Sequence, residues 1–461
     1  MAQLRASEHK FRTVKQEIRQ NLLARLRAGE DPFPGIIGFG QTVLPQLERS
    51  LLAGHDVILL GSRGQGKTRL IRTLTGLLDE WTPTVTGCEI NDHPYAPVCA
   101  RCRRLAAAHG DDLAISWRHR SDRYGEKLAT PDTSVGDLIG DIDPVKVAEG
   151  RTLGDPETIH FGLVPRTNRG VFCLNELPDL AERIQVALLN VLEERDIGVR
   201  GYALRLPLDL VLVASANPED YTNRGRIITP LKDRFGAEIR THYPTSLAAE
   251  LALIRQESRL AWDGEEPGAA VPGHLVQVIA RFTRLVRASP AVDARSGVSA
   301  RFAIAATEAV AASAVRRAAI SGEAQPVARV CDLPSIVSTL RGKVEFEVSE
   351  EGREQEVLEH LLRRAIAETF RATLGSADLA GLLAKFEEGR SVESGDLTPA
   401  PDLLRRIGEV PGLAKIMGRL GMDGGESFGE AAAALEFTLE GLYLMRRLSK
   451  DTIDGGAVYR T

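Results

Sequence analysis

Hydrophobic and polar residues alternate in two different ways along the chain, and the change comes near residue 244. From residue 31 to that point, short apolar runs alternate with amphipathic stretches and glycine-rich turns, which is typical of a mostly parallel sheet wrapped by helices. The clearest runs are DVILLG (56–61), GVFCL (170–174) and DLVLVASA (209–216). Because these runs are apolar on both faces, we expect three central strands covered on both sides.

Beyond residue 244 the strand pattern fades, and alanine-rich segments with helical periodicity follow, such as ARFAIAATEAVAASAVRRAAI (300–320). This change indicates a separate helical domain. We therefore predict an α/β chain with the following parts: an N-terminal helix over residues 1–30, an α/β core over 31–245 with a cysteine-rich insertion at 85–120, a helical domain over 246–340, and a further helical C-terminal region over 341–461.

The N-terminal segment has the pattern of an amphipathic helix. Apolar residues recur there at helical spacing with Lys and Arg between them, at Phe11, Val14, Ile18, Leu22 and Leu26. Such a helix could lie on a membrane surface or act as an organelle address. Glu8 and Glu17 interrupt the basic face, which favours a solvated helix with one side on the main body.

Composition narrows the class of protein. Of the 461 residues, 43% are apolar and 26% are charged, as in ordinary globular proteins. No segment has the apolar length needed to cross a bilayer, and a net charge of −5 gives no general attraction to nucleic acid. The five cysteines, an odd number without an export signal, indicate a reducing compartment. We expect a cytoplasmic protein without membrane or nucleic-acid contacts.

The run GSRGQGKT (61–68) joins the first strand to the helical stretch RLIRTLTGLL. Its glycines let the backbone curl so that amide N–H groups and a helix N-terminus converge on phosphate oxygens. Lys67 can pair with the β and γ phosphates, and the Thr68 hydroxyl can bind Mg²⁺. The alternative is a glycine-rich turn without a ligand. We predict a nucleotide-binding loop made of Gly61, Ser62, Arg63, Gly64, Gln65, Gly66, Lys67 and Thr68.

Further motifs follow in a fixed order after GSRGQGKT. They are GLVPRTNRGVFCLNE (162–176), SANPED (215–220), PLKDRFG (230–236) and GVSARFA (297–303). With the loop, this set resembles the AAA+ ATPases, and among them the branch of the magnesium chelatase ATPase subunit and the MoxR-type proteins. The resemblance implies a P-loop AAA+ core with a central parallel sheet, an all-helical lid at 246–340, and ATP and Mg²⁺ as cofactors.

Asn175 stands where the resemblance places an aspartate. In these enzymes a buried strand ends in Asp-Glu: the aspartate helps to hold Mg²⁺ through its water shell, and the glutamate polarises the attacking water. The oxygen of Asn175 can still accept a hydrogen bond from such a water, so we expect weaker metal binding. Because Glu176 is retained, we expect slow ATP hydrolysis. The alternative is a nucleotide-gated scaffold that binds ATP without turnover.

Three more residues acquire catalytic roles through the resemblance. Asn217 resembles the sensor that contacts the γ phosphate or the attacking water, and it also suits a helix cap. Arg234 matches the arginine finger that reaches the neighbouring subunit. A surface arginine paired with an adjacent aspartate is the alternative, and Arg224 and Arg226 are rival fingers. Arg301 resembles the second sensor on the lid.

Cys88, Cys99 and Cys102 lie within fifteen residues of the predicted insertion. A Cys-x-x-Cys pair can bind Zn²⁺ from a single turn, and His93, His109 or no residue would complete the site. The alternatives are a loop with three reduced thiols, or a redox pair, for which no thioredoxin-like surroundings are present. A bound zinc ion would have a structural role.

The resemblance also implies partners. Related proteins form rings, so we expect a homo-oligomer, a hexamer, that remodels a partner protein by ATP hydrolysis. Loops facing the ring centre would come from the stretch before Gly170 and from a hairpin at 196–207. Relatives often act with a partner that carries a von Willebrand factor A domain, so the resemblance implies such a partner. This chain lacks that domain's metal motif itself, because DTSVG at Asp132 has Gly136 where the motif needs a second serine. A true chelatase subunit is a narrower alternative.

Overall fold

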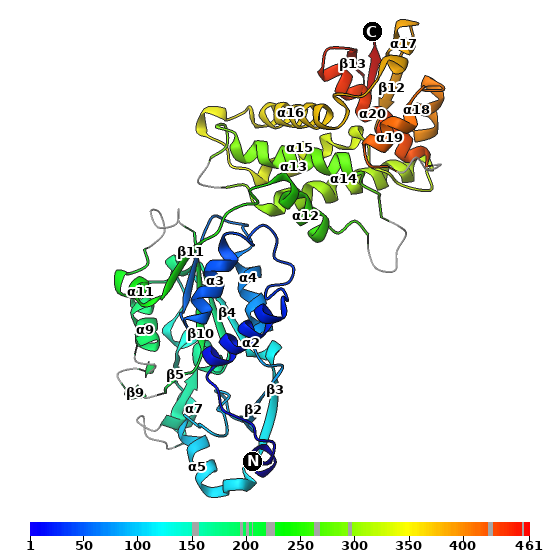
Figure 1. Ribbon diagram of the computed structural model, residues 1–461. Helices are drawn as coiled ribbons and strands as arrows, with labels where there is room; N and C mark the ends of the chain where they lie inside the picture. Colours follow the sequence, from blue (N-terminus) through cyan, green and yellow to red (C-terminus); the bar gives the residue numbers. More distant parts are fainter. Residues whose placement is uncertain are drawn as a thin grey trace. The chain divides into compact units, whose positions relative to one another are not determined.

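The computed structural model describes residues 1–149, 156–193, 197–199, 202–204, 206–217, 226–261, 268–293, 297–422, 427–453 and 456–461. These residues fall into two compact units, Met1–His242 and Tyr243–Thr461, whose elements are labelled in Figure 1. Each unit is built around hydrophobic clusters of its own.

A five-stranded parallel sheet forms the centre of the first unit. Its strands lie in the order β11 (Ala237–Arg240), β1 (Val57–Leu60), β10 (Val211–Ala216), β7 (Val171–Asn175) and β4 (Tyr124–Leu128). All four neighbouring pairs are parallel. The three strands expected from their apolar runs, β1, β7 and β10, are buried along their whole length. The predicted α/β fold class is therefore confirmed.

Helices cover both faces of this sheet. Along β1, odd-numbered residues belong to the cluster that includes α2 (Val14–Ala28), α3 (Val43–Leu52) and α4 (Lys67–Thr73), whereas even-numbered residues belong to the cluster that includes α9 (Glu182–Glu193). Successive side chains of a strand point to opposite faces, so the two clusters lie on the two sides of the sheet. Figure 1 shows α3 and α4 on one side of the strands and α9 on the other.

The amphipathic N-terminal segment follows the short helix α1 (Ala2–Ala6) and forms α2. Thr13 caps α2 through a reciprocal capping box with Gln16, which satisfies backbone donors of the first turn. Val14, Ile18 and Leu22 are buried in the cluster on the sheet. The apolar face of this helix is therefore part of the core of the first unit.

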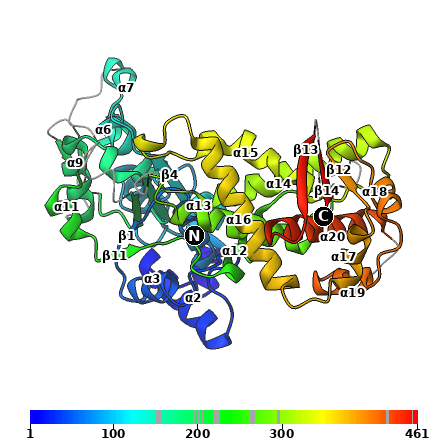
Figure 2. The same cartoon turned by 90° about the horizontal axis from the view of Figure 1, so that it is seen from above.

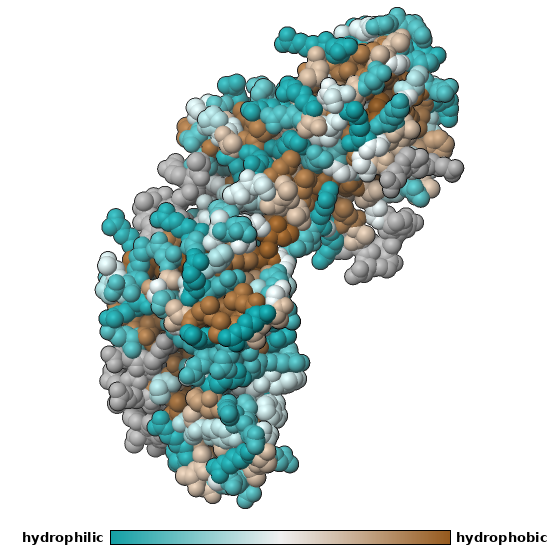
Figure 3. Space-filling view, in the orientation of Figure 1, coloured by the Kyte–Doolittle hydropathy of each residue, from teal (hydrophilic) through white to brown (hydrophobic). Residues whose placement is uncertain are grey.

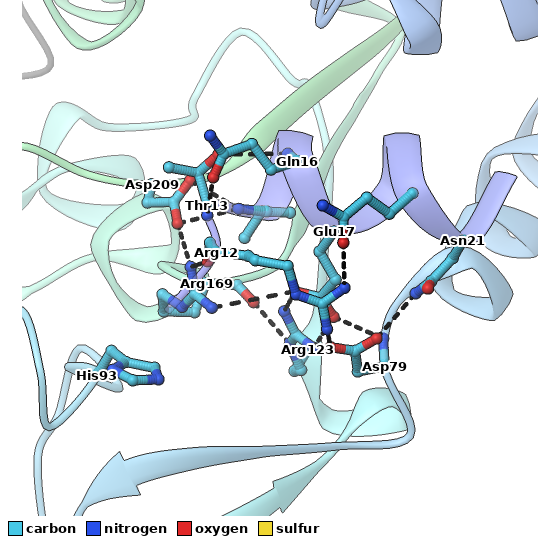
Figure 4. Close-up of polar contacts among 12 residues, drawn as sticks. Arg12, Thr13, Gln16, Glu17, Asn21, Asp79, His93, Arg123, Arg169 and Asp209 are labelled. Carbon is cyan, nitrogen blue, oxygen red and sulfur yellow. Dashed lines mark hydrogen bonds and ion pairs between the residues drawn. The ribbon is translucent and has the colours of Figure 1, made fainter. Parts of the chain in front are cut away.

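A network of charged side chains joins α2 to the amino ends of the central strands (Figure 4). Arg123, just before β4, donates to both carboxylate oxygens of Glu17 at 2.6 and 2.8 Å, and the two side chains are 0% and 2% exposed. Arg169, ahead of β7, pairs with Asp209, ahead of β10. Both oxygens of Asp209 also accept the Val14 N–H at 3.0 Å. One helix is thus tied to three strands.

Smaller sheets extend the first unit. The insertion predicted at 85–120 contains α5 (Ala100–His109) and β3 (Ile115–His119), and β3 pairs antiparallel with β2 (Trp81–Val85), which leads into the insertion. The hairpin expected at 196–207 contains the antiparallel pair β8 (Ile197–Val199) and β9 (Tyr202–Leu204). Another antiparallel pair is formed by β5 (Gly140–Ile142) and β6 (Ile159–Phe161), and short helices complete the unit at α6 (Val135–Leu138), α7 (Pro144–Ala148), α8 (Leu163–Arg166) and α11 (Thr229–Arg234).

The second unit is mainly helical and has one hydrophobic core that extends from Ile254 to Tyr459. Its helices are α12 (Leu247–Glu257), α13 (Gly273–Ala288), α14 (Ala300–Ser321), α15 (Pro334–Leu340), α16 (Glu354–Leu374), α17 (Ala380–Glu387), α18 (Ala400–Ile407), α19 (Leu413–Arg419) and α20 (Phe428–Leu444). No described helix of either unit is long and apolar enough to cross a membrane. Hydrophilic residues occupy most of the face seen in Figure 3.

An antiparallel sheet near the end of the chain adds to the predicted helical C-terminal region. It has the order β12 (Val392–Gly395), β14 (Gly456–Arg460), β13 (Ser449–Ile453), and Figure 2 shows it beside α20. The Tyr459 hydroxyl donates to Glu440 of α20 at 2.5 Å. These strands are short and of mixed polarity, so the sequence pattern did not distinguish them from loops.

Candidate functional site

The loop between β1 and α4 holds the predicted nucleotide-binding residues in a tight backbone path. Gly64 and Gly66 have φ angles of 69° and 82°, which glycine adopts without strain. A Cβ atom at Gly61 would lie 2.0 Å from the Thr241 hydroxyl oxygen and 2.1 Å from Gln65 Oε1. A larger residue at position 61 would therefore displace the side chains of Thr241 and Gln65.

Lys67 folds back over this loop. The side chain is only 7% exposed, and Nζ donates to the carbonyl oxygens of Gly61 and, at 3.1 Å, of Ser62. Thr241, which follows β11, has its hydroxyl oxygen 2.6 Å from Gln65 Oε1 and 3.2 Å from the carbonyl of Leu60. Thr241 thus fixes the loop, and sequence reasoning did not single it out.

Asn175 ends β7 and connects the loop with the neighbouring strands. Its Oδ1 atom accepts the Thr68 hydroxyl at 3.3 Å and the Ser215 hydroxyl at 3.0 Å. Its Nδ2 atom donates to Oε1 of Glu126 at 2.7 Å. Because an ionised carboxylate only accepts hydrogen bonds, the amide nitrogen must face Glu126 and the oxygen must face Thr68.

Glu126 is a second residue that sequence reasoning missed. It lies on β4 opposite Cys173 of β7. Its Oε2 atom accepts two hydrogen bonds from Arg72, at 3.0 and 2.9 Å, and one from the Tyr124 hydroxyl at 2.9 Å. Its contact with Asn175 depends on the order of the strands, and no local motif in the sequence signals it.

Glu176 and Asn217 follow directly on adjacent strands. Glu176 has a φ of 55°, a left-handed conformation that costs a non-glycine residue roughly 1–3 kcal/mol, and its N–H donates to the Ser215 hydroxyl at 3.4 Å. Asn217 is 3% exposed. Among the described residues its Oδ1 atom has no hydrogen-bond partner. A buried acceptor of this kind costs about 1–3 kcal/mol, which a donor on a ligand or water would offset.

The predicted arginines lie on surfaces. Arg234 ends α11, is 44% exposed on its side chain, and pairs with Glu193 of α9 at 2.5 Å. The rival Arg226 is exposed, and Arg224 lies outside the described residues. Arg301 is an exposed residue in the first turn of α14, in the second unit.

The three cysteines of the insertion come together with an acidic residue. The candidate ligand atoms of Cys88, Asp92, Cys99 and Cys102 all lie within 4.8 Å of one another, and the thiols are free. Hydrogen bonds from Cys102 and Cys99 lower the pKa of Cys88 to about 3. Burial, and then the charge of Cys88, raises the pKa of Asp92 to about 6.

Neither histidine considered as a ligand joins this group. The Nε2 atom of His93 lies 3.2 Å from Nε2 of His9, and its Nδ1 atom accepts the Tyr95 N–H at 3.1 Å. Burial, with a smaller effect from the charge of Arg169, lowers the pKa of His93 to about 3. His109 is exposed at the end of α5. Asp92 is thus the fourth candidate ligand of the cluster, where the sequence suggested a histidine.

The curated proteins that resemble this chain include subunits of magnesium chelatase. No protein-family model matches the chain. The chain is 30% identical over 240 residues to the magnesium-chelatase 38 kDa subunit of Acidiphilium rubrum, covering 50% of this chain and 64% of that subunit. It is 28% identical over 238 residues to magnesium-chelatase subunit ChlI of a Nostoc species, covering 49% of this chain and 58% of that subunit. The chain thus spans less than two thirds of these relatives.

Solved structures also match at low identity. The complex of subunits BchI and BchD of magnesium chelatase, from single-particle cryo-EM, contains a chain 21% identical to this one, with 71% of this chain and 98% of that chain covered and a TM-score of 0.35. NtrX from Brucella abortus with ATP is 12% identical, with 80% and 71% covered and a TM-score of 0.42.

Proposed function

We propose that this chain, which is homologous to the AAA+ ATPase subunits of magnesium chelatase, binds ATP with Mg²⁺ and hydrolyses the terminal phosphoanhydride bond. One observation carries the proposal: the Lys67 loop, Asn217 and the Asn175–Glu176 pair follow the carboxyl ends of the adjacent strands β1, β10 and β7. Ligands of open α/β sheets bind at that edge. The left-handed glycines, and the Asn217 oxygen that has no hydrogen-bond partner in the described part of the chain, fit a phosphate ligand with ordered water.

Each residue then has a distinct task. The loop amides and Lys67 would bind the phosphates, and the Thr68 hydroxyl with Asn175 Oδ1 would hold the hydrated Mg²⁺. When bound, the ion neutralises charge on the phosphates. Glu176 would polarise the attacking water and take up its proton. The Oδ1 atom of Asn217 can accept a hydrogen bond from the same water and so orient it.

The Asn175–Glu126 contact supports hydrolysis despite the missing aspartate. An aspartate at position 175 would place a carboxylate where Nδ2 now donates to Glu126 at 2.7 Å, and two carboxylates this close disfavour ionisation of both. The amide of Asn175 therefore suits the carboxylate of Glu126, to which it donates a hydrogen bond. We propose Glu126 as a positioning residue that fixes the orientation of the Asn175 amide.

Phosphate release by the purified protein tests the ATPase proposal directly. We expect release that depends on both ATP and Mg²⁺, and Glu176→Gln should retain bound ATP while losing release. Nucleotide binding without release at any Mg²⁺ concentration would instead favour the nucleotide-gated scaffold. Absence of nucleotide binding would contradict both proposals.

A charge exchange tests the positioning role of Glu126. Asn175→Asp alone should weaken Mg²⁺-dependent binding of a fluorescent ATP analogue, because it places two carboxylates against each other. This reverses the expectation from the sequence alone, in which an aspartate at position 175 binds the metal more tightly, because the contact with Glu126 is seen only in the structure. Adding Glu126→Gln should restore that binding, since a glutamine amide can donate to the new aspartate. Binding by Asn175→Asp at or above the wild-type level, with no gain in the double variant, would contradict this role.

We further propose that the chain works as a ring, expected to be a hexamer, that remodels a partner protein. Arg234 would act in the nucleotide site of the neighbouring subunit. Its support is a partly exposed pair with Glu193, which is weak enough in solvent to exchange for a phosphate. Mixing Arg234→Ala with Glu176→Gln subunits should restore part of the ATPase activity. No recovery at any mixing ratio would contradict a finger acting between subunits.

The partner and the substrate of the motor are proposed from relatives. The BchI chain is described in complex with BchD, and we propose a comparable partner for this chain, carrying a von Willebrand factor A domain. Insertion of Mg²⁺ into a porphyrin is the narrower alternative. Stimulation of the ATPase by a protein of that domain class, without chelation of added porphyrin, would favour the remodelling motor.

A further inference from the structure

We infer that Cys88, Asp92, Cys99 and Cys102 form a closed tetrahedral Zn²⁺ site that braces the insertion between β2 and β3. This inference is independent of the proposed ATPase function. In a tetrahedral site with Zn–S bonds of about 2.3 Å, sulfur atoms lie about 3.8 Å apart. The sulfur atoms of Cys88 and Cys99 are 4.0 Å apart, and all four ligand atoms lie within 4.8 Å of one another.

The side chain of Asp92 supports a bound cation independently of the three thiols. Its side chain is 1% exposed. The Oδ2 atom accepts the N–H groups of Val98 at 3.0 Å and Cys99 at 2.9 Å, whereas Oδ1 is buried without a hydrogen-bond partner in the described part of the chain. An unpaired buried carboxylate oxygen is unfavourable. A cation held by the neighbouring thiolates would pair with it.

Backbone donors already orient two of the sulfur atoms. The Asp92 N–H donates to Sγ of Cys88 at 3.3 Å, and the Cys102 N–H donates to Sγ of Cys99 at 3.3 Å. Hydrogen bonds of this kind favour the thiolate, which is the form that binds metal. Cys99 is also the N-cap of the ten-residue helix α5, whose dipole favours negative charge there.

The chemistry of the four ligands selects among metals. Thiolates favour Zn²⁺, Cu⁺ and iron–sulfur clusters over Mg²⁺ and Ca²⁺, which prefer oxygen ligands. Iron–sulfur clusters are usually held by four thiolates, and a carboxylate oxygen is a common zinc ligand. Three sulfur ligands and one oxygen ligand would fill all four coordination positions and leave none for a substrate. This ligand set therefore indicates a structural zinc site.

The site would fix a segment that leads to the proposed catalytic strand. Two residues between Cys88 and Asp92 form hydrogen bonds with this segment. The carbonyl of Ile90 accepts a hydrogen bond from Nδ2 of Asn168 at 3.0 Å. The side chain of Asn91 donates a hydrogen bond to the carbonyl of Arg166 at 2.7 Å. Residues 166 and 168 lie just ahead of β7. The metal would thus hold the insertion in place against the chain that enters this strand.

Metal analysis of the full chain tests the site. Protein produced with zinc present should carry about one zinc per chain by mass spectrometry of its metals, and X-ray absorption should give three sulfur ligands and one oxygen. Asp92→Asn should lose zinc to a chromogenic chelator at least about ten times more readily, and Cys99→Ser with Cys102→Ser should carry none. The matched controls Cys331→Ser and His109→Ala should keep the wild-type content.

Two outcomes would overturn the inference. One is wild-type protein that stays free of zinc after production in zinc and unfolds at the same temperature with and without chelator. The other is a zinc ion whose absorption spectrum contains nitrogen in place of oxygen and whose retention is unaffected by Asp92→Asn. In the first case, a protein mass 2 Da below that of the fully reduced chain would show that two of the thiols form a disulfide instead of binding metal. Measurements on the wild type decide the matter even if the double cysteine variant fails to fold.

Discussion

The two edges of the central sheet carry polar residues of different kinds. At the amino ends of the strands, Arg123 and Arg169 meet Glu17 and Asp209, so charged groups find charged partners within the chain. At the carboxyl ends, the side chains that follow the strands are mainly amides and hydroxyls, and Asn217 keeps a buried oxygen unpaired among the described residues. Both edges are equally part of the fold.

We interpret this difference as one between polar groups that hold the fold and polar groups that would bind the proposed nucleotide. Removing one partner of a buried ion pair leaves the other charge uncompensated and is strongly destabilising. The paired charges of the amino edge therefore hold the fold, although Nε of Arg169 is buried without a hydrogen-bond partner among the described residues. Groups with spare hydrogen-bonding capacity cost stability in the free protein and recover it with a ligand. We therefore expect substitutions at the amino edge to lower the free energy of unfolding, and substitutions at the carboxyl edge to reduce nucleotide binding or hydrolysis.

The largest effect should come from Glu17→Ala at the amino edge. It leaves the guanidinium of Arg123 buried without its carboxylate, so the free energy of unfolding should fall by about 3–5 kcal/mol, measured by urea denaturation of the full chain. Arg364→Ala, which breaks the exposed pair with Glu368, is the control and should change it by less than about 0.5 kcal/mol. An equal loss of unfolding free energy in Glu17→Ala and Arg364→Ala would show that the ion pair at the amino edge has no special role in stability.

Glu176→Gln should have the next largest effect, on turnover. Loss of the group that takes the water's proton should reduce phosphate release about 100-fold or more, while nucleotide affinity and the unfolding midpoint stay close to wild type. Glu182→Gln, an exposed change at the start of α9, should keep normal turnover. A large loss of stability in Glu176→Gln would mean that this edge is structural as well.

Lys67→Ala should weaken ATP binding about 100-fold, because charge-assisted hydrogen bonds to the phosphates are lost. Titration of a fluorescent ATP analogue measures this affinity. Lys232→Ala, at an exposed lysine paired with Glu238, provides the control with the same change in net charge. Unchanged affinity in Lys67→Ala would refute the phosphate-binding loop.

The smallest effect should come from Thr241→Val, which removes the hydroxyl beside Gln65 and leaves the side-chain volume nearly unchanged. One neutral hydrogen bond is worth about 1 kcal/mol, so ATP affinity should fall about fivefold. Thr75→Val is the control: its lost hydroxyl donates to the carbonyl of Arg72 at 2.8 Å, and affinity should not change. A loss equal in both variants would point to a general effect of threonine removal on the helix region.

Features that are contiguous in sequence were predicted well. The apolar runs gave the strands β1, β7 and β10, and the glycine spacing gave the loop at 61–68, because each depends on neighbouring residues. The resemblance to the magnesium chelatase branch of AAA+ ATPases, which depended on five separated motifs, is confirmed by the curated relatives. The roles assigned to the site residues stay predictions, for the loop at 61–68 as well as for Asn175, Glu176, Asn217, Arg234 and Arg301.

Features that depend on distant pairing were missed. Glu126 lies on the short strand YGEKL, whose mixed polarity gives no clear period, and it meets Asn175 only because β4 pairs with β7. Asp92, in CEINDHPY, cannot be told from a surface aspartate until the chain turns back to Cys99 and Cys102. The strands β12 and β14 are separated by about sixty residues, and long-range pairing leaves little local signal.

The bond between the Val14 N–H and Asp209 joins residues 195 positions apart, and this distance sets an order of events during synthesis. At about 5–20 residues per second, the ribosome needs roughly 10–40 s to add the residues that separate α2 from its anchor. Until then, the apolar face of α2 has no completed sheet to cover. Helix α2 is therefore made early but is among the last parts of its unit to dock, and the nascent chain must stay protected from aggregation throughout that interval.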